Sequence, residues 1–122
     1  MHFLTYIFLL FTPGIIFCQP EINFKKKVHK FPKTKEGITL EHDFLFTNTG
    51  NEPLIINNIK VSCTCTKFSY ADETIKPGKS GYIHVTFDTN KKYNWQDREL
   101  MIMSNAKNNP ETIRFKVMVD NK

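Results

Sequence analysis

Apolar and polar side chains alternate along most of the chain beyond residue 20, and this two-residue period limits the fold more than any other feature. The clearest run extends from Thr112 to Asp120, where every odd-numbered residue is apolar and most even-numbered residues are polar. Successive side chains of a β-strand point to opposite faces of its sheet, so such a run buries one face and exposes the other. No segment keeps a helical period over three turns. We therefore predict an all-β chain.

Other runs with the same period predict further strands. The residues that share one face are Ile83, Val85 and Phe87 in the run 82–88, and Ile38, Leu40, His42, Phe44 and Phe46 in the run 38–46. Segments 54–56 and 59–65 read as one strand that Asn57 and Asn58 interrupt, where a β-bulge can switch the exposed face. Segments 22–28 and 99–103 complete the predicted strands.

Turn-forming residues separate these runs, at 35–37, 48–51, 76–79, 88–94 and 105–110. Pro77 and Gly78 match the two central positions of a type II turn, in which Gly accepts a positive φ. We expect the Asn48 side chain to bond nearby backbone at a strand end, and Gly50 to supply conformational freedom for the turn that follows. Six or seven short strands in about 100 residues indicate one β-sandwich.

The first eighteen residues read as a secretory signal peptide. They contain no Lys, Arg, Asp or Glu, and an apolar core from Phe3 to Phe11 is followed by the helix-breaking pair Pro13-Gly14. This order matches an apolar leader cleaved after Cys18. We therefore predict residues 1–18 as a signal peptide and residues 19–122 as the domain, located in the periplasm or outside the cell.

The alternative is that Cys18 carries a lipid anchor, although the bulky Phe17 before it is unfavourable for that processing. A retained membrane helix is disfavoured, because Pro13-Gly14 interrupts a stretch already shorter than the ~20 apolar residues that a span needs. After cleavage, the protein is not expected to be an integral membrane protein.

The net charge is +5, from 17 Lys and Arg against 12 Asp and Glu. The basic residues are scattered, apart from Lys25 to Lys27 and Lys91-Lys92. On an exported protein, scattered lysines keep the surface soluble and discourage pairing at exposed edge strands. We therefore expect no nucleic-acid partner.

A combination of motifs resembles one bacterial family. The motifs are Phe44-x-Phe46-x-Asn48-Thr49-Gly50, Pro53-Leu54-x-Ile56, Ser62-Cys63-Thr64-Cys65-Thr66, Pro77-Gly78 and Ser104-Asn105. Together they resemble the domain-of-unknown-function family 1573, which is similar to the Hydin-like group of immunoglobulin-like domains, from about Ile22 to Val119. The resemblance implies an immunoglobulin-like antiparallel β-sandwich of about seven strands in an exported bacterial protein, with no established activity.

Cys63 and Cys65 are the chemically suggestive pair of the predicted domain. In an extended strand their Cα atoms lie about 6.5–7 Å apart, so a disulfide requires a kinked backbone. Export favours the oxidised pair. Alternatively, the thiols pack as small apolar groups in line with Ile59 and Val61, or they bind Cu(I), which accepts two soft ligands. The sequence leaves these three alternatives open and does not by itself establish a metal site.

Tyr93, Asn94 and Trp95 lie in a predicted loop and are candidate partner-binding residues. Aromatic side chains often anchor interfaces, although packing over the open end of a sandwich is their commoner use. His42 lies in an apolar register, so we expect it to be partly buried and bonded to backbone, whereas His84 is expected to face solvent.

Motifs for catalysis or cofactor binding are missing from the sequence, which has no Gly-rich phosphate loop, no nucleophile elbow and no His-Glu-x-x-His. We therefore predict a non-enzymatic module without a cofactor, which binds or scaffolds a protein or another component of the bacterial envelope. The alternative function is a thiol-redox or copper-handling protein that uses Cys63 and Cys65.

Overall fold

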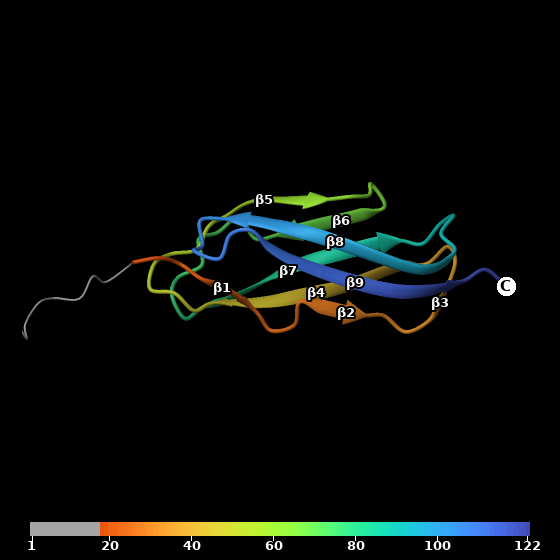
Figure 1. Cartoon of the computed structure of the whole chain (residues 1–122), viewed down its shortest axis with the longest axis horizontal. Coiled ribbons are helices and arrows are strands. Elements are labelled where there is room, and N and C mark those ends of the chain that lie inside the picture. Colours follow the sequence, from red (N-terminus) through yellow and green to blue (C-terminus); the bar gives the residue numbers. More distant parts are fainter. Residues whose placement is uncertain (1–17) are drawn as a thin grey trace, which may run out of the picture.

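The computed structural model describes residues 18–122, which form two β-sheets packed face to face (Figure 1). One sheet has the strand order β1-β4-β7-β6, and the other has the order β2-β9-β8-β5 with β3 also paired to β9. The first sheet consists of β1 (Ile22–Phe24), β4 (Thr39–Asn48), β7 (Ser80–Asp88) and β6 (Thr66–Tyr70). The second consists of β2 (Val28–Lys30), β3 (Thr34–Lys35), β9 (Glu111–Asp120), β8 (Asn94–Ser104) and β5 (Ile56–Val61). The described residues contain no helix, which confirms the all-β prediction.

The predicted signal peptide falls outside the described residues, apart from Cys18. Cys18 is exposed and is not part of a disulfide. Between residues 18 and 122, no helix has the length and hydropathy that crossing a bilayer requires.

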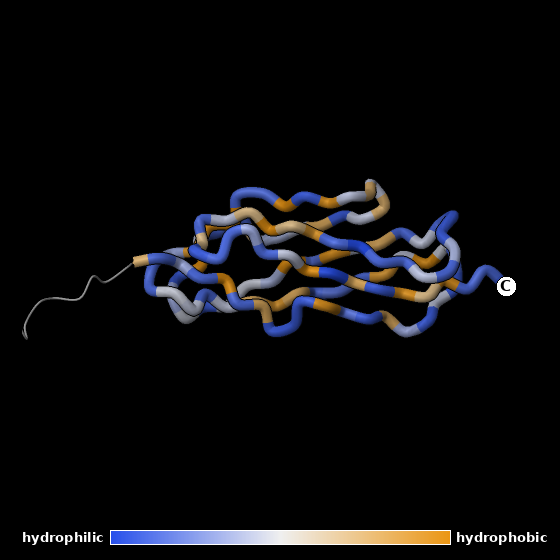
Figure 2. Tube along the Cα trace, in the orientation of Figure 1, coloured by the Kyte–Doolittle hydropathy of each residue, from blue (hydrophilic) through white to orange (hydrophobic). Residues whose placement is uncertain are grey.

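The predicted alternation places the hydrophobic core between the two sheets. The buried faces of β7 and β9 are those expected, and they consist of Ile83, Val85, Phe87, Ile113, Phe115, Val117 and Val119. In β4 the buried apolar residues are Phe44 and Phe46, and Leu40 and His42 of the same predicted face are half-buried. Ile38 lies just before the strand and is exposed. Figure 2 shows this pattern as hydrophobic and hydrophilic segments that follow one another along the strands. Burial of this apolar surface, at about 25 cal/mol per Å², holds the two sheets together.

The N-terminal segment forms three short strands where one strand was predicted. β1 pairs antiparallel with β4, and the chain then crosses to the other sheet, where β2 and β3 run parallel to β9. Pro32 lies between β2 and β3. Proline has no N–H group to donate a hydrogen bond to a neighbouring strand, so the pairing with β9 is interrupted here. The described residues therefore form nine strands instead of about seven, and the five-stranded sheet is mixed and not purely antiparallel.

The segment predicted as one strand from residue 54 to residue 65 is divided. Leu54 forms an isolated bridge to Ile75, and β5 begins only at Ile56. A register shift between Ile56 and Asn58 confirms the irregularity predicted at the asparagine pair. β5 ends at Val61, so the residues that follow do not continue the strand.

Residues 63–65 belong to the connection between β5 and β6. β6 is absent from the predicted strands, although Phe68 and Tyr70 alternate with polar residues within it. Because β5 and β6 belong to different sheets, this connection carries the chain from one sheet to the other.

Asn48 fixes the end of β4 through every polar atom of its side chain, which is fully buried. Its Oδ1 accepts hydrogen bonds from the main-chain N–H groups of Glu21 and Gly50, at 3.2 and 3.0 Å. Its Nδ2 donates hydrogen bonds to the carbonyl oxygens of Glu52 and Ile75, at 2.7 and 2.9 Å. This buried amide therefore ties together three segments that lie far apart in the sequence.

Gly50 and Gly78 are needed for different reasons. Gly78 follows Pro77 with a φ of +79°, and the Lys79 N–H donates to the Lys76 carbonyl at 3.0 Å, as in a type II turn. Gly50 has no positive φ, so its position does not use the conformational freedom that we expected. A Cβ atom on Gly50 would lie 2.3 Å from the Gln19 carbonyl oxygen, so the missing side chain makes room for the N-terminal segment.

Candidate functional site

The candidate partner-binding residues lie at the start of β8, where a loop was predicted. Asn94 and Trp95 open the strand, opposite Val119 and Met118 of β9, and Tyr93 directly precedes it. Asn94 has a φ of 61°, a left-handed conformation that Asn adopts more readily than most residues. Tyr93 is 60% exposed and Trp95 is 53% exposed, so neither ring packs over the end of the sandwich.

Adjoining shallow hollows surround these aromatic residues on the outer face of the five-stranded sheet. We call them the Trp95 groove, and its lining includes Lys30, Lys33, Tyr93, Trp95, Lys116 and Met118. Lys30 Nζ lies 5.3 Å from the centroid of the Trp95 ring, within the range of a cation–π interaction. The parallel pairing of β2 with β9 brings Lys30 to this position, opposite Lys116. Neither Lys30 nor Met118 was a predicted site residue, because Lys30 comes near Trp95 through the pairing of β2 with β9, and Met118 through the pairing of β8 with β9.

Positive charge predominates in the Trp95 groove. Lys33 lies 3.9 Å from the Asp120 carboxylate, and the nearby Asp97 carboxylate is paired with Arg114 on the same sheet face. The ion pairs of residues 18–122 include neither Lys30 nor Lys116. These two ammonium groups are therefore available to an anionic group on a partner.

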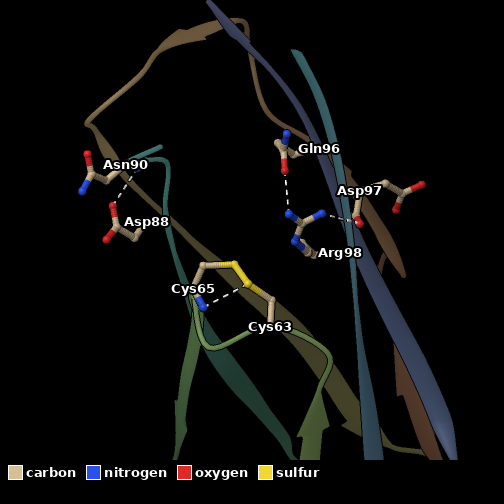
Figure 3. The surroundings of a disulfide bond; sticks show 7 residues. All are labelled: Cys63, Cys65, Asp88, Asn90, Gln96, Asp97 and Arg98. Atoms are coloured by element: carbon tan, nitrogen blue, oxygen red, sulfur yellow. Dashed lines mark hydrogen bonds between the residues drawn. A yellow bond between two sulfur atoms is a disulfide. The ribbon is translucent and has the colours of Figure 1, made fainter. Parts of the chain in front are cut away.

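Cys63 and Cys65 form a disulfide in the connection between β5 and β6, with their Cα atoms 5.2 Å apart (Figure 3). The turn supplies the backbone kink that an extended strand lacks. Of the three alternatives that the sequence left open, the structure contains the oxidised pair. No group of three or more His, Cys, Asp or Glu side chains in the described part of the chain is arranged to hold a metal ion.

His42 stacks on another histidine instead of making the expected backbone hydrogen bond. Its ring lies 3.6 Å from the His29 ring with an interplanar angle of 9°, so the contact joins β4 of one sheet to β2 of the other. Burial lowers the pKa of both imidazoles, and Lys26 lowers them further. For His42, the pKa is also lowered by His29 and raised by Asp43.

His84 lies on the outer face of the four-stranded sheet. Its Nδ1 is 2.6 Å from an Asp43 carboxylate oxygen, and its Nε2 is 3.4 Å from Glu41. The hydrogen bond to Asp43 raises the pKa of His84, opposed by desolvation and supported by Glu41. On acidification, the stacked histidine pair should therefore lower the stability of the folded state, whereas His84 should raise it.

Acidification from about pH 7.5 to pH 5.5 should reveal these opposite responses in two variants. His42 has a lowered pKa in the folded protein, so the unfolded chain binds more protons as the pH falls and the folded state loses stability. His84 has a raised pKa, so its stabilising contribution is complete below the unfolded pKa of 6.5 and is lost as the pH rises. The melting temperature of His42→Phe should therefore fall less than that of the wild type on acidification, and that of His84→Gln should fall more.

The check is the difference between each variant and the wild type across the pH series, not the melting temperature at one pH. His42→Phe keeps an aromatic ring next to His29, which limits the change in packing. A His42→Phe profile parallel to that of the wild type would contradict the lowered pKa.

The sequence matches one family model, described as "Protein of unknown function (DUF1573)", over residues 22–119. The match confirms the resemblance to family 1573 and covers the same span. No curated protein matches the chain in sequence.

Solved structures share the fold at low sequence identity. A protein of unknown function from Porphyromonas gingivalis W83 is 17% identical, with 90% of this chain and 51% of that chain covered and a TM-score of 0.69. The VesB protease of Vibrio cholerae is 14% identical, with 98% and 35% covered and a TM-score of 0.63. The ASH/PapD-like domain of human CEP192 is 12% identical, with 91% and 92% covered and a TM-score of 0.64.

The chain thus spans about half of the first of these structures and about a third of the second. At these identities the likeness concerns the fold alone. It confirms the prediction of an immunoglobulin-like β-sandwich.

Proposed function

The chain belongs to the DUF1573 family, whose function is unknown, and from its own surface we propose that it is an exported, non-enzymatic binding module of the bacterial envelope. The proposal places the protein in the periplasm or outside the cell after removal of residues 1–18. Its partner is a protein or another envelope component, which it holds through the Trp95 groove.

The observation that carries this proposal is the exposure of two large aromatic rings at the start of a paired strand. Tyr93 and Trp95 lie at the start of β8, and both keep more than half of their surface in contact with solvent. Tyr and Trp are enriched among the residues that contribute most to binding, because they bury a large area with few rotatable bonds. A strand paired along its length to β9 holds these rings in place before a partner arrives.

The charge around the rings indicates the chemistry of the partner surface. Lys30 and Lys116 flank Trp95 without a carboxylate partner, and the whole chain has a net charge of +5. An acidic partner surface would complement these lysines and would associate faster at low ionic strength. We therefore propose a partner with acidic groups around an apolar contact.

Trp95→Ala tests the proposal on the purified protein. Envelope extract is passed over the immobilised wild type, a retained component is identified and purified, and its Kd is measured for each variant. We expect Trp95→Ala to weaken binding at least about tenfold, as for a central aromatic interface residue. Added salt should weaken binding of the wild type as well.

Tyr82→Ala is the matched control, because Tyr82 is 52% exposed on the opposite sheet, in β7. It should bind like the wild type, and both variants should keep the wild-type melting temperature, since exposed substitutions change stability little. If Tyr82→Ala loses binding and Trp95→Ala does not, the proposed surface is wrong. If the wild type retains no component even at low salt, the proposed binding function is wrong.

A further inference from the structure

The disulfide lies beside a cationic side chain that has no carboxylate partner. Antiparallel pairing of β5 with β8 ends at Val61, opposite Leu100. Cys63 follows Val61 by two residues and Arg98 precedes Leu100 by two residues, so both lie beyond the same end of this pairing, and Arg98 shares the face of Leu100 in β8. Figure 3 shows Arg98 next to the Cys63 side of the disulfide.

The groups that Arg98 contacts directly, through two hydrogen bonds and one ring contact, are neutral. Its guanidinium donates hydrogen bonds to Gln96 Oε1 at 2.6 Å and to the Asp97 main-chain carbonyl at 3.1 Å. It also lies over the Phe87 ring, 5.4 Å from the centroid. The Nε atom is buried and has no hydrogen-bond partner. A half-buried cation without a counter-ion is costly, so an anion next to it would be stabilised.

Figure 3 shows Asp88 of β7 on the Cys65 side of the disulfide, where its carboxylate accepts a hydrogen bond from the Asn90 main-chain N–H, and shows Arg98 on the Cys63 side. The groups on the Arg98 side that can become anionic include the sulfur atoms of the cysteine pair. The carboxylates of Asp97 and Glu99 are directed to the other face of β8, where both are paired with Arg114. A thiolate next to a fixed positive charge has a lowered pKa, and a thiol with a lowered pKa is also a better leaving group in disulfide exchange.

We infer that Cys63–Cys65 is an exchangeable disulfide, in which Arg98 stabilises the Cys63 thiolate released when a dithiol attacks Cys65. Thr64, between the two cysteines, is exposed, and both cysteines are half-buried, so an attacking thiolate can approach the turn from solvent. This activity is independent of the Trp95 groove and of the function proposed for it.

The exchange balances in two steps. A thiolate of the dithiol attacks Cys65 Sγ, a new sulfur–sulfur bond forms, and the electron pair of the broken bond leaves on Cys63 Sγ next to Arg98. The second thiol of the dithiol then loses its proton and attacks the first sulfur of the dithiol, which is bound to Cys65 in the mixed disulfide. This attack closes the dithiol into a disulfide. Cys65 leaves as a thiolate and takes up a proton. The protein disulfide is thus reduced by two electrons, and the dithiol is oxidised by two.

The first measurement is the pKa of Cys63, from the pH dependence of its alkylation by iodoacetamide. The protein carries Cys18→Ser and Cys65→Ser, so that Cys63 is the thiol that reacts. We expect a pKa at least about one unit below the ordinary value of about 8.5. Adding Arg98→Gln should raise this pKa to the ordinary value or above, and Arg98→Lys should keep much of the lowering.

The second measurement is the rate at which dithiothreitol reduces the disulfide in the Cys18→Ser protein. Arg98→Gln should slow this reduction about threefold or more, because a one-unit rise in leaving-group pKa slows exchange by about that factor. Arg114→Gln is the matched control, since Arg114 is an arginine on the outer face of the same sheet, and it should leave both measurements unchanged. Far-ultraviolet circular dichroism checks that each variant is folded.

The inference is overturned if Cys63 has an ordinary or raised pKa that does not change in Arg98→Gln. It is also overturned if Arg98→Gln and Arg114→Gln reduce at the same rate as the parent protein. If Arg98→Gln does not fold, the absolute pKa of Cys63 in the parent and in Arg98→Lys decides. The inference requires both values to lie below the ordinary value of about 8.5, and an ordinary or raised value in both overturns it. Loss of partner binding in Trp95→Ala bears on the proposed function only.

Discussion

Replacement of Asn48 by Ala is expected to destabilise the protein by about 4 kcal/mol, because four hydrogen bonds to a buried amide are lost at about 1 kcal/mol each. For a domain of this size the melting temperature should fall by about 20 °C, measured by thermal unfolding in parallel with urea titration.

Asn90→Ala is the matched control for this prediction. Asn90 is an exposed asparagine whose bond to Asp88 comes from its main-chain N–H, so its side chain can be removed at little cost. A loss below about 1 kcal/mol in Asn48→Ala would contradict the prediction and would show that water replaces the amide.

Phe115→Ala should destabilise the protein by about 3–5 kcal/mol, the range for deleting a buried aromatic side chain. The Phe115 side chain is fully buried in the central strand pair, with ring centroids 5.0 Å from Phe87 and 5.8 Å from Phe31. The free energy of unfolding from urea titration is the measurement.

Lys116→Ala, one residue further along β9, is the control, because its side chain points to the opposite face. It should change the free energy of unfolding by less than about 0.5 kcal/mol. If Lys116→Ala costs more than Phe115→Ala, the register of β9 is shifted by one residue, since such a shift exchanges the buried and exposed faces.

Local alternation was sufficient to predict the long strands and their buried faces. Phe115 and Val85 are buried as predicted because each belongs to a run with a strict two-residue period, bounded by turn residues. The three short strands before residue 36 could not be predicted in the same way. β1 pairs with β4, whereas the partner of β2 and β3 is β9, about 85 residues further along, and this parallel pairing depends on where the chain crosses between sheets.

In the candidate sites, too, residues with a local sequence signal could be predicted, and residues that matter through a distant strand could not. The sequence singled out Trp95 and the cysteine pair, because aromatic residues near a turn and closely spaced thiols are visible locally. Lys30 and Arg98 carry no such signal, since each becomes relevant only through a neighbour from another strand. The alternation of Gln96, Arg98 and Leu100 could have indicated that the arginine points inward, because Leu100 shares its face.

The role of Gly50 illustrates a different limit. A glycine in a turn suggests positive φ, whereas here the backbone of residues 19–21 passes so close that any side chain would collide with it. A contact of this kind leaves no trace in the local sequence.

That contact also determines at which end of the sandwich the N-terminal segment lies. Gly50 and Asn51 hold Gln19 at one tip of the elongated sandwich, while Tyr93 and Trp95 lie beside residues 118–122 at the far tip (Figure 1). A tether attached ahead of Gln19 would therefore hold the protein at the tip that contains Gly50. Tyr93 and Trp95 would then lie at the tip farthest from the tether. The length of the two sheets would then set the reach between the anchoring point and whatever is captured.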